Sequence, residues 1–267
     1  MANALPHAKA SRRRLDPLAL VISLTAADSG LSRRAMAALL RLRQRQLETI
    51  EHSRGALVKI SPREQPPLLD LGAVGRDSPL TADYHSLAVL QLITDFPERG
   101  SELRALLNAR RNGLDLQALA EALWREDGGE AFAAAAARHG LDPHLLAGTL
   151  WVALKPLYEA VAAASLRHFE LPGDGDDCPV CGGPPWARSG DRLQCAVCES
   201  HWDSELTGRM FRTAEGPQPR GATRLYDAAT GQRLLELEPA LLPHAFDPGP
   251  LIELLQLLDK PTSSVNA

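Results

Sequence analysis

The chain has 267 residues, of which 45% are apolar and 23% charged, and its net charge is -4. This mixture is typical of a folded globular protein and excludes a wholly disordered chain or a fibrous repeat. The length exceeds that of most single domains and predicts one large and one small domain. Leu and Ala dominate while aromatic residues make up only 4%, which favours helices over strands.

The charge is unevenly distributed along the chain. Residues 1–60 contain 11 Lys and Arg against 4 Asp and Glu, so this segment is basic although the whole chain is acidic. A basic segment of this kind could meet an acidic protein surface or nucleic acid. The other interpretation is that its arginines form the solvated face of a helix. These arginines are Arg33, Arg34, Arg41, Arg43 and Arg45.

No targeting or membrane segment is predicted. The arginines near the N-terminus precede an apolar stretch, as in a twin-arginine export signal, but Asp16 and Pro17 interrupt that stretch and no cleavage site follows. The most apolar window, residues 148–166, contains Lys155 and Glu159, so we expect no membrane span. A cytoplasmic location follows, in which cysteines stay reduced and bind metal more often than they form disulfides.

In chain order, the first part of the sequence predicts helices. Residues 32–52 have the spacing of an amphipathic helix, and residues 60–80 form a connector rich in proline. From residue 81 to residue 169, helical patterns follow one another, each bounded by capping residues or glycine. Pro172 and Gly173 end this helical part.

The second part predicts short strands and a final helix. Residues 223–238 have the pattern of a hairpin, and residues 246–260 that of a closing amphipathic helix. The predicted fold is mainly α: an N-terminal helical bundle, a small β-rich domain of the rubredoxin-like or zinc-ribbon kind, and a C-terminal helix. The predicted parts are a basic arm with the first helix (1–60), the bundle (61–172), a zinc ribbon (173–215), a degenerate second ribbon hairpin with the C-terminal helix (216–260) and a flexible tail (261–267).

The four cysteines form two C-x-x-C pairs, Cys178 with Cys181 and Cys195 with Cys198, separated by thirteen residues. Each turn directs two thiolates to one point, and a connecting hairpin brings the pairs together as the four ligands of a metal ion. Gly182 allows the positive φ that such a turn needs. Because four thiolates leave no open coordination position, the predicted Zn²⁺ is structural.

Two other interpretations of the cysteines stay open. Iron in a rubredoxin-like site is the alternative metal, because the same ligands suit either ion. A catalytic dithiol ranks third, since redox C-x-x-C motifs usually begin a helix in a strand-helix-strand context, which is absent here. His201 follows the second pair closely, but four cysteines already satisfy zinc, so we expect it not to be a ligand.

The remaining signals favour neither nucleic acid nor catalysis. Residues 173–215 contain 4 Arg and no Lys against 8 Asp and Glu, a balance that opposes binding along a phosphate backbone. A nucleic-acid-binding regulator that uses the basic N-terminal helix is therefore the alternative function. The sequence has no nucleophile elbow, phosphate-binding glycine loop or open metal site, and its scattered histidines are interpreted as packing or surface residues, so we expect no enzyme.

Four motifs together resemble the formate dehydrogenase accessory protein (FdhE) family: "CPVCG" from Cys178, "CAVCESHW" from Cys195, "PPLLDL" over residues 66–71 and "LWVALKPLY" over residues 150–158. The resemblance implies a cytoplasmic maturation factor without turnover of its own. Its partner would be the catalytic subunit of a molybdenum- or tungsten-dependent formate dehydrogenase, or a related molybdoenzyme, during assembly. The resemblance leaves open which dehydrogenase is served and the oligomeric state.

The sequence departs from the family pattern in the second ribbon, where that pattern has two more cysteine pairs. The corresponding positions are Arg209, Arg212, Asp227 and, by the following glycine, Thr230. The resemblance therefore implies a second ribbon that keeps its hairpins and has lost its metal. Apolar packing is expected to take the place of that metal, through Met210, Phe211, Leu225, Tyr226 and Leu234.

Overall fold

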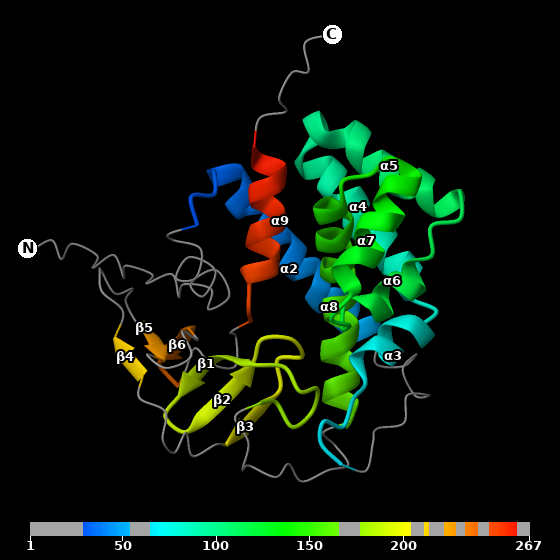
Figure 1. The fold of residues 1–267 in the computed structure, drawn as a ribbon. Coiled ribbons are helices and arrows are strands. Elements are labelled where there is room, and N and C mark those ends of the chain that lie inside the picture. The colour runs from blue at the N-terminus through cyan, green and yellow to red at the C-terminus, as the bar shows by residue number, and fades with distance from the viewer. Residues whose placement is uncertain are drawn as a thin grey trace, which may run out of the picture.

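The computed structural model describes residues 29–53, 65–165, 177–203, 211–213, 222–227, 233–239 and 246–260. Within these ranges a bundle of helices stands beside a small six-stranded sheet (Figure 1). The mainly α fold that the sequence predicts is confirmed, with the sheet and the C-terminal helix in the expected order. The helices are α2 (Arg33–Ser53), α3 (Leu71–Asp77), α4 (Thr81–Asp95), η1 (Pro97–Arg99), α5 (Gly100–Arg111), α6 (Leu116–Ala122), α7 (Gly128–His139), α8 (Pro143–Ser165) and α9 (Gly249–Asp259).

The local sequence sets several helix ends. Asp70 and Asp115 each accept backbone N–H bonds at the start of α3 and α6. Asp142 Oδ1 accepts the N–H of Leu145 at 2.8 Å, which caps α8. Gly140 ends α7 with a φ of 65°, a left-handed conformation that glycine adopts without strain. Asp142 and Gly140 are among the boundary signals from which the helices were predicted. Helix α3 was not predicted, because it lies within residues 60–80, which the sequence predicted as a connector.

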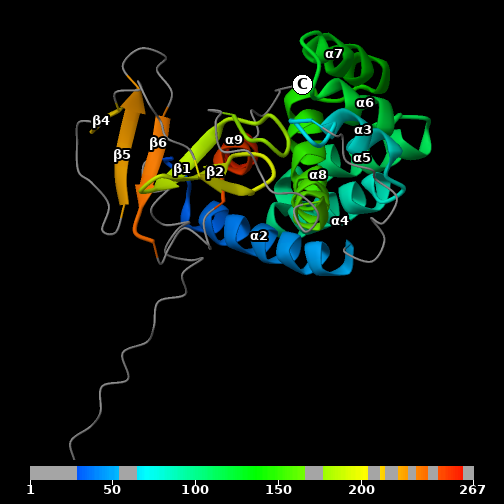
Figure 2. The same ribbon diagram turned by 90° about the horizontal axis from the view of Figure 1, so that it is seen from below.

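Helix α8 is the centre of the bundle. It contacts α2, α3, α4, α6, α7 and α9 (Figure 2). Every residue from 152 to 162 is buried. The segment Pro143–Ala164 is long and apolar enough to cross a membrane. The sequence had predicted no membrane span. In this structure 83% of an 18-residue window within this segment is buried inside the protein, as in the core helix of a bundle.

The C-terminal helix α9 lies beside the first described helix, α2 (Figure 1). Ser32 Oγ donates to Asp259 Oδ1 at 2.8 Å, which ties the start of α2 to the end of α9. Leu251, Leu255 and Leu258 of α9 are buried in the common core. Apolar residues at this spacing share one helix face, so α9 closes the bundle as the sequence predicted.

The sheet has the order β3-β2-β1-β6-β5-β4. Strands β1 and β6 are parallel, and all other neighbours are antiparallel. The first ribbon and the second hairpin therefore form one continuous sheet, joined at the β1–β6 pair. The strands are β1 (Pro185–Ser189), β2 (Arg192–Cys195), β3 (His201–Asp203), β4 (Phe211–Thr213), β5 (Ala222–Asp227) and β6 (Arg233–Leu237).

The predicted hairpin over residues 223–238 is confirmed as β5 and β6. Leu225 lies opposite Leu234 in this pair, and both side chains are buried. Apolar packing between these two residues thus occupies this part of the second hairpin, as expected for Leu225 and Leu234. Arg209, Met210 and Thr230 lie outside the described residues, as do the side chains of Phe211, Tyr226 and Asp227.

The helical bundle and the cysteine end of the sheet share one hydrophobic core. Buried residues of α2, α4 and α8 form a single cluster with Val180, Val197, Trp202 and all four cysteines. The ribbon is therefore packed against the bundle through a common apolar interior. The predicted limits at residues 60, 172 and 215 remain predictions about the chain, and the segments 1–28 and 261–267 lie outside the described residues.

Arg33, Arg34, Arg41 and Arg45 of α2 are exposed, as expected for a solvated helix face, and Arg43 is the exception. Arg43 is 4% exposed, and its guanidinium contacts Glu159 of α8 at 2.6 Å. Its charged group also lies 4.5 Å from the ring centre of Phe246, a cation–π contact. Arg34 and Arg41 are exposed but form ion pairs with Glu98 and Asp95. Helix α2 is thus attached to its neighbours by charge as well as by apolar packing.

Candidate metal centre

The four cysteine sulfurs gather at one point. The Sγ atoms of Cys178 and Cys198 are 3.7 Å apart, those of Cys181 and Cys195 are 3.5 Å apart, and all four lie within 4.8 Å of one another. Sulfur atoms at the corners of a tetrahedron with metal–sulfur bonds of about 2.3 Å are about 3.8 Å apart. The spacing therefore fits one four-coordinate ion, and it is too long for disulfide bonds of about 2.05 Å.

Backbone geometry in the first cysteine turn, residues 178–182, directs two of these sulfurs. Gly182 N–H donates to Cys178 O at 2.7 Å, and Gly182 has a φ of 74°, as the sequence predicted for the residue after Cys181. Gly183 N–H points to Cys181 Sγ at 3.4 Å. Amides aimed at a sulfur stabilise its thiolate form, which is the form that binds a metal.

The second cysteine turn, residues 195–199, has a similar arrangement. The N–H groups of Val197 and Cys198 point to Cys195 Sγ at 3.3 and 3.5 Å. Glu199 has a φ of 58°, a left-handed conformation that is uncommon for a residue other than glycine. The turn thus holds Glu199 in a costly conformation that its contacts must stabilise.

The ionisation of the sulfurs favours a cation at this point. Burial, together with hydrogen bonds shared among the thiols, raises the pKa of Cys198. Burial acts in the same sense on Cys195, but hydrogen bonds from the other three thiols and from the Cys198 N–H outweigh it and lower the pKa of Cys195. Four buried sulfurs ionise together only with a positive ion among them, so the donor set fits a thiolate-binding metal such as Zn²⁺ or iron.

The sulfurs are closed to outside molecules. Cys178, Cys195 and Cys198 are at most 2% exposed and Cys181 is 9% exposed. His201 lies in β3 opposite Gln194, and it is not one of the side chains whose ligand atoms gather with the sulfurs. An ion held by all four cysteines would have no position for a water molecule or a substrate.

The segment that contains the "PPLLDL" motif holds the first cysteine turn. Leu68 N–H donates to Pro179 O at 3.1 Å, and Leu69 N–H donates to Val180 O at 2.7 Å. Both leucines are buried. The two carbonyls belong to the residues between Cys178 and Cys181, so the segment before α3 is bonded to the backbone of the turn itself.

Lys155 of α8 holds the second cysteine turn. Its Nζ donates to the carbonyl oxygens of Ala196 and Val197 at 3.0 and 3.3 Å, and it forms a short ion pair with Glu199. Lys155 is completely buried. Burial lowers its pKa, but the carboxylates of Glu199 and Glu159 more than offset this and leave the pKa raised, so the ammonium stays charged at neutral pH.

Sequence reasoning noticed Lys155 only as a charge within an apolar window. Nothing in the residues near it in the chain identifies its partners, which lie more than 40 positions away. The signal that could have found it is physical: a lysine at the centre of an otherwise apolar helix requires a buried acceptor.

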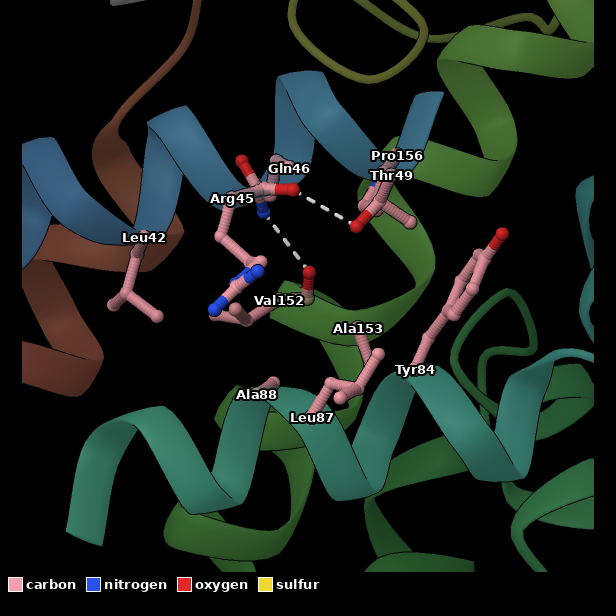
Figure 3. Close-up of a pocket in the computed structure, with 10 residues that line it drawn as sticks. All are labelled: Leu42, Arg45, Gln46, Thr49, Tyr84, Leu87, Ala88, Val152, Ala153 and Pro156. Atoms are coloured by element: carbon pink, nitrogen blue, oxygen red, sulfur yellow. Dashed lines mark hydrogen bonds between the residues drawn. The ribbon is translucent and has the colours of Figure 1, made fainter. Parts of the chain in front are cut away.

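A hollow between α2, α4 and α8 is the other candidate site (Figure 3). Its lining is mostly apolar, with Arg45, Gln46 and Thr49 as its polar side chains from α2. Among the described residues that line it there is no cysteine, histidine or carboxylate, and the phenol of Tyr84 has no such group beside it in the lining to activate it for catalysis. The residues are Leu42, Arg45, Gln46, Thr49, Tyr84, Leu87, Ala88, Val152, Ala153 and Pro156.

The fold and the site together define a helical bundle into which a four-cysteine ribbon is embedded. No protein-family model and no curated protein matches the chain. Among solved structures, the chain is similar to the crystal structure of the FdhE protein from Pseudomonas aeruginosa, with 19% identity, a TM-score of 0.36, and coverage of 88% of this chain and 89% of that chain.

Proposed function

We propose that this protein is an accessory or maturation factor that binds the catalytic subunit of a molybdenum- or tungsten-dependent formate dehydrogenase during assembly in the cytoplasm. The observation that carries the proposal is that the motifs resembling the FdhE family meet at one place. The "PPLLDL" segment bonds to the first cysteine turn, and Lys155 of the "LWVALKPLY" segment bonds to the second. Motifs that are far apart in the sequence thus form a single structural unit, which favours one shared origin for the resemblance.

In this proposal Cys178, Cys181, Cys195 and Cys198 bind one Zn²⁺ ion, with iron as the alternative. The closed geometry supports a structural role, because four thiolates fill the coordination of the ion. The ion would supply folding energy to a small sheet and would fix the shape of the surface around it. We propose that the protein acts by binding another protein, with no turnover of its own.

Affinity purification and a deletion strain test the proposal together. The tagged protein, isolated under native conditions, is expected to enrich a formate dehydrogenase catalytic subunit, and deletion is expected to lower formate oxidation. Complementation with the Cys195→Ser variant should fail to restore activity, whereas Glu130→Gln, a substitution of an exposed residue in α7, should restore it. Unchanged formate oxidation in the deletion strain, with no subunit enriched, contradicts the proposal.

The nucleic-acid alternative gains no support from the described residues. Arg34, Arg41 and Arg43 of α2 each contact a carboxylate on a neighbouring element. An arginine already paired within the protein must break that pair or share it before it can bind phosphate, and Arg43 is buried as well. We therefore keep the assembly role as the proposed function.

A further inference from the structure

The metal centre is held by the bundle at both of its cysteine turns. Leu68 and Leu69 donate backbone N–H groups to the first turn, and Lys155 donates its ammonium to the second. All of these bonds go to main-chain carbonyls between the two cysteines of a turn. The positions of the sulfurs are therefore connected to the helical bundle through the backbone that carries them.

Lys155 uses its full bonding capacity at this contact. A lysine ammonium has three N–H donors, and here its acceptors are Ala196 O, Val197 O and the carboxylate of Glu199. Glu199 in turn accepts from Gln194 Nε2 at 2.9 Å and from the backbone N–H of Asp247 at 3.2 Å. The network thus joins α8, strand β2, the second turn and the segment before α9.

The charge of Lys155 also suits a metal held by thiolates. A divalent ion with four thiolate ligands carries a net negative charge, which is costly to bury unless a positive group lies near it. The ammonium of Lys155 binds the main chain between Cys195 and Cys198, so its positive charge lies directly behind this turn. Arg43 belongs to the same buried network through Glu159, and none of its hydrogen bonds in the described structure goes to the cysteine turn.

We propose that Lys155 is a positioning residue of the metal centre, which sets the second cysteine turn for metal binding and links metal binding to the docking of the sheet on α8. The inference rests on the proposed four-cysteine site and is independent of the client. Linkage is reciprocal: if Lys155 favours metal binding by fixing the turn, the metal favours the contact of the turn with α8 by the same free energy.

The first experiment measures metal affinity in the full-length protein. Competition with a chromophoric chelator gives the affinity for Zn²⁺, and Co²⁺ absorption reports tetrahedral thiolate coordination. Lys155→Met is expected to weaken Zn²⁺ binding about 10- to 100-fold, as is typical when a group that orients metal ligands is removed. Arg43→Met is the matched control, because it also removes a buried cation from the network but leaves the bonds to the turn intact, so its metal affinity should stay close to that of the wild type.

The second experiment needs no variant, so it decides the question even if Lys155→Met fails to fold. Hydrogen exchange of the wild-type protein is compared with and without Zn²⁺. Removal of the metal is expected to speed exchange in α8 around Lys155 and at the amides of Leu68 and Leu69, and to leave α5, which has no bond to the cysteine turns among the described residues, unchanged.

Each outcome bears on one proposal only. A wild-type protein that binds no Zn²⁺, Co²⁺ or iron contradicts the four-cysteine metal site itself. A folded Lys155→Met variant with wild-type metal affinity overturns the positioning role, and so does wild-type exchange in α8 that is the same with and without metal. If Arg43→Met weakens metal binding as much as Lys155→Met does, the effect belongs to general stability, and the specific role of Lys155 is likewise overturned.

Discussion

The side-chain amide of Gln46 donates to the carbonyl oxygen of Val152 at 2.9 Å, across the contact between α2 and α8 (Figure 3). Four residues after Val152 the chain has Pro156, which has no backbone N–H to donate to that carbonyl. Gln46 thus takes the place of the missing helical hydrogen bond. Both Gln46 and Val152 are buried, and the amide supplies the donor that this carbonyl lacks within its own helix.

Gln46→Met is therefore expected to lower the free energy of unfolding by about 1–3 kcal/mol, the cost of a buried carbonyl without a donor. Gln44→Met on the exposed side of the same helix is the control and should change stability by less than about 0.5 kcal/mol. Urea unfolding of the metal-loaded protein measures both. Equal effects of the two substitutions contradict the assigned role of Gln46.

The same relationship predicts coupling between positions 46 and 156. Pro156→Ala restores an N–H in α8 that can donate to Val152 O, so the loss of Gln46 should then cost less. In a double-mutant cycle, Gln46→Met in the Pro156→Ala background is expected to destabilise by at least about 0.5 kcal/mol less than in the wild-type background. Strict additivity of the two changes indicates that the side chain of Gln46 stabilises the protein in another way.

The ion pair between Arg43 and Glu159 gives a different prediction. Both side chains are buried, and removing one partner leaves the other charged in the core. Arg43→Met is expected to lower the free energy of unfolding by about 3–5 kcal/mol. Arg45→Met removes an exposed pair with Glu48 and should cost at most about 1 kcal/mol, an effect that salt reduces. Comparable losses for the two variants, measured by thermal unfolding at low and high salt, contradict this ranking.

Much of the fold followed from local signals in the sequence. Asp142 before Pro143 marks the start of α8, and Gly140 marks the end of α7, because caps and left-handed glycines act within a few residues. The proximity of the four sulfurs was predictable for the same reason, since each C-x-x-C turn is local and one hairpin joins the two.

Contacts between distant parts of the chain were not predictable in this way. The burial of Arg43 depends on Glu159, which lies 116 positions further along, and α2 by itself has the pattern of a solvated face. The partners of Lys155 and the joining of the two ribbons through the parallel pair β1–β6 are also long-range. Amphipathic periodicity fixes which face of an element is apolar, whereas the pairing of buried charges is fixed by tertiary packing.

His85 makes the stability of the bundle sensitive to acid. It is completely buried in α4, and its Nε2 lies 3.2 Å from Thr149 Oγ1. Thr149 donates its hydroxyl proton to Leu145 O, so Nε2 of His85 is the donor to Thr149 Oγ1. Burial, with a smaller contribution from the charge of Arg110, lowers the pKa of His85 from 6.5 to about 4.

The direction of the pH effect follows from this lowered pKa. The unfolded chain binds a proton at His85 below about pH 6.5, whereas the folded protein binds it only near pH 4. The contribution of the neutral histidine is complete above pH 6.5 and is lost as the pH falls, by up to about 3 kcal/mol. Between pH 7 and pH 4 the free energy of unfolding of the wild type is thus expected to fall by about 3 kcal/mol more than that of His85→Gln. Urea unfolding measures both proteins across this pH range, and parallel pH profiles contradict the prediction. Any metal release in acid affects both proteins equally, because both keep the four cysteines, so it does not contribute to the difference between them.

Gly183 follows the first cysteine turn and lies against Val197 and Cys195 of the second turn, so it leaves little space beside the sulfurs. A Cβ atom on this glycine would lie 2.8 Å from Val197 Cγ2 and 3.1 Å from Cys195 Sγ, both closer than side chains normally approach. Gly183→Ala should therefore displace the second turn, cost about 1–3 kcal/mol through overpacking and speed the release of Zn²⁺ to a chelator. Gly129→Ala in α7 meets no atom within 4 Å and should leave stability the same or slightly higher, with unchanged release of the metal. Metal release from Gly183→Ala at the wild-type rate means that Val197 and Cys195 do not lie as close to Gly183 in solution as these distances require.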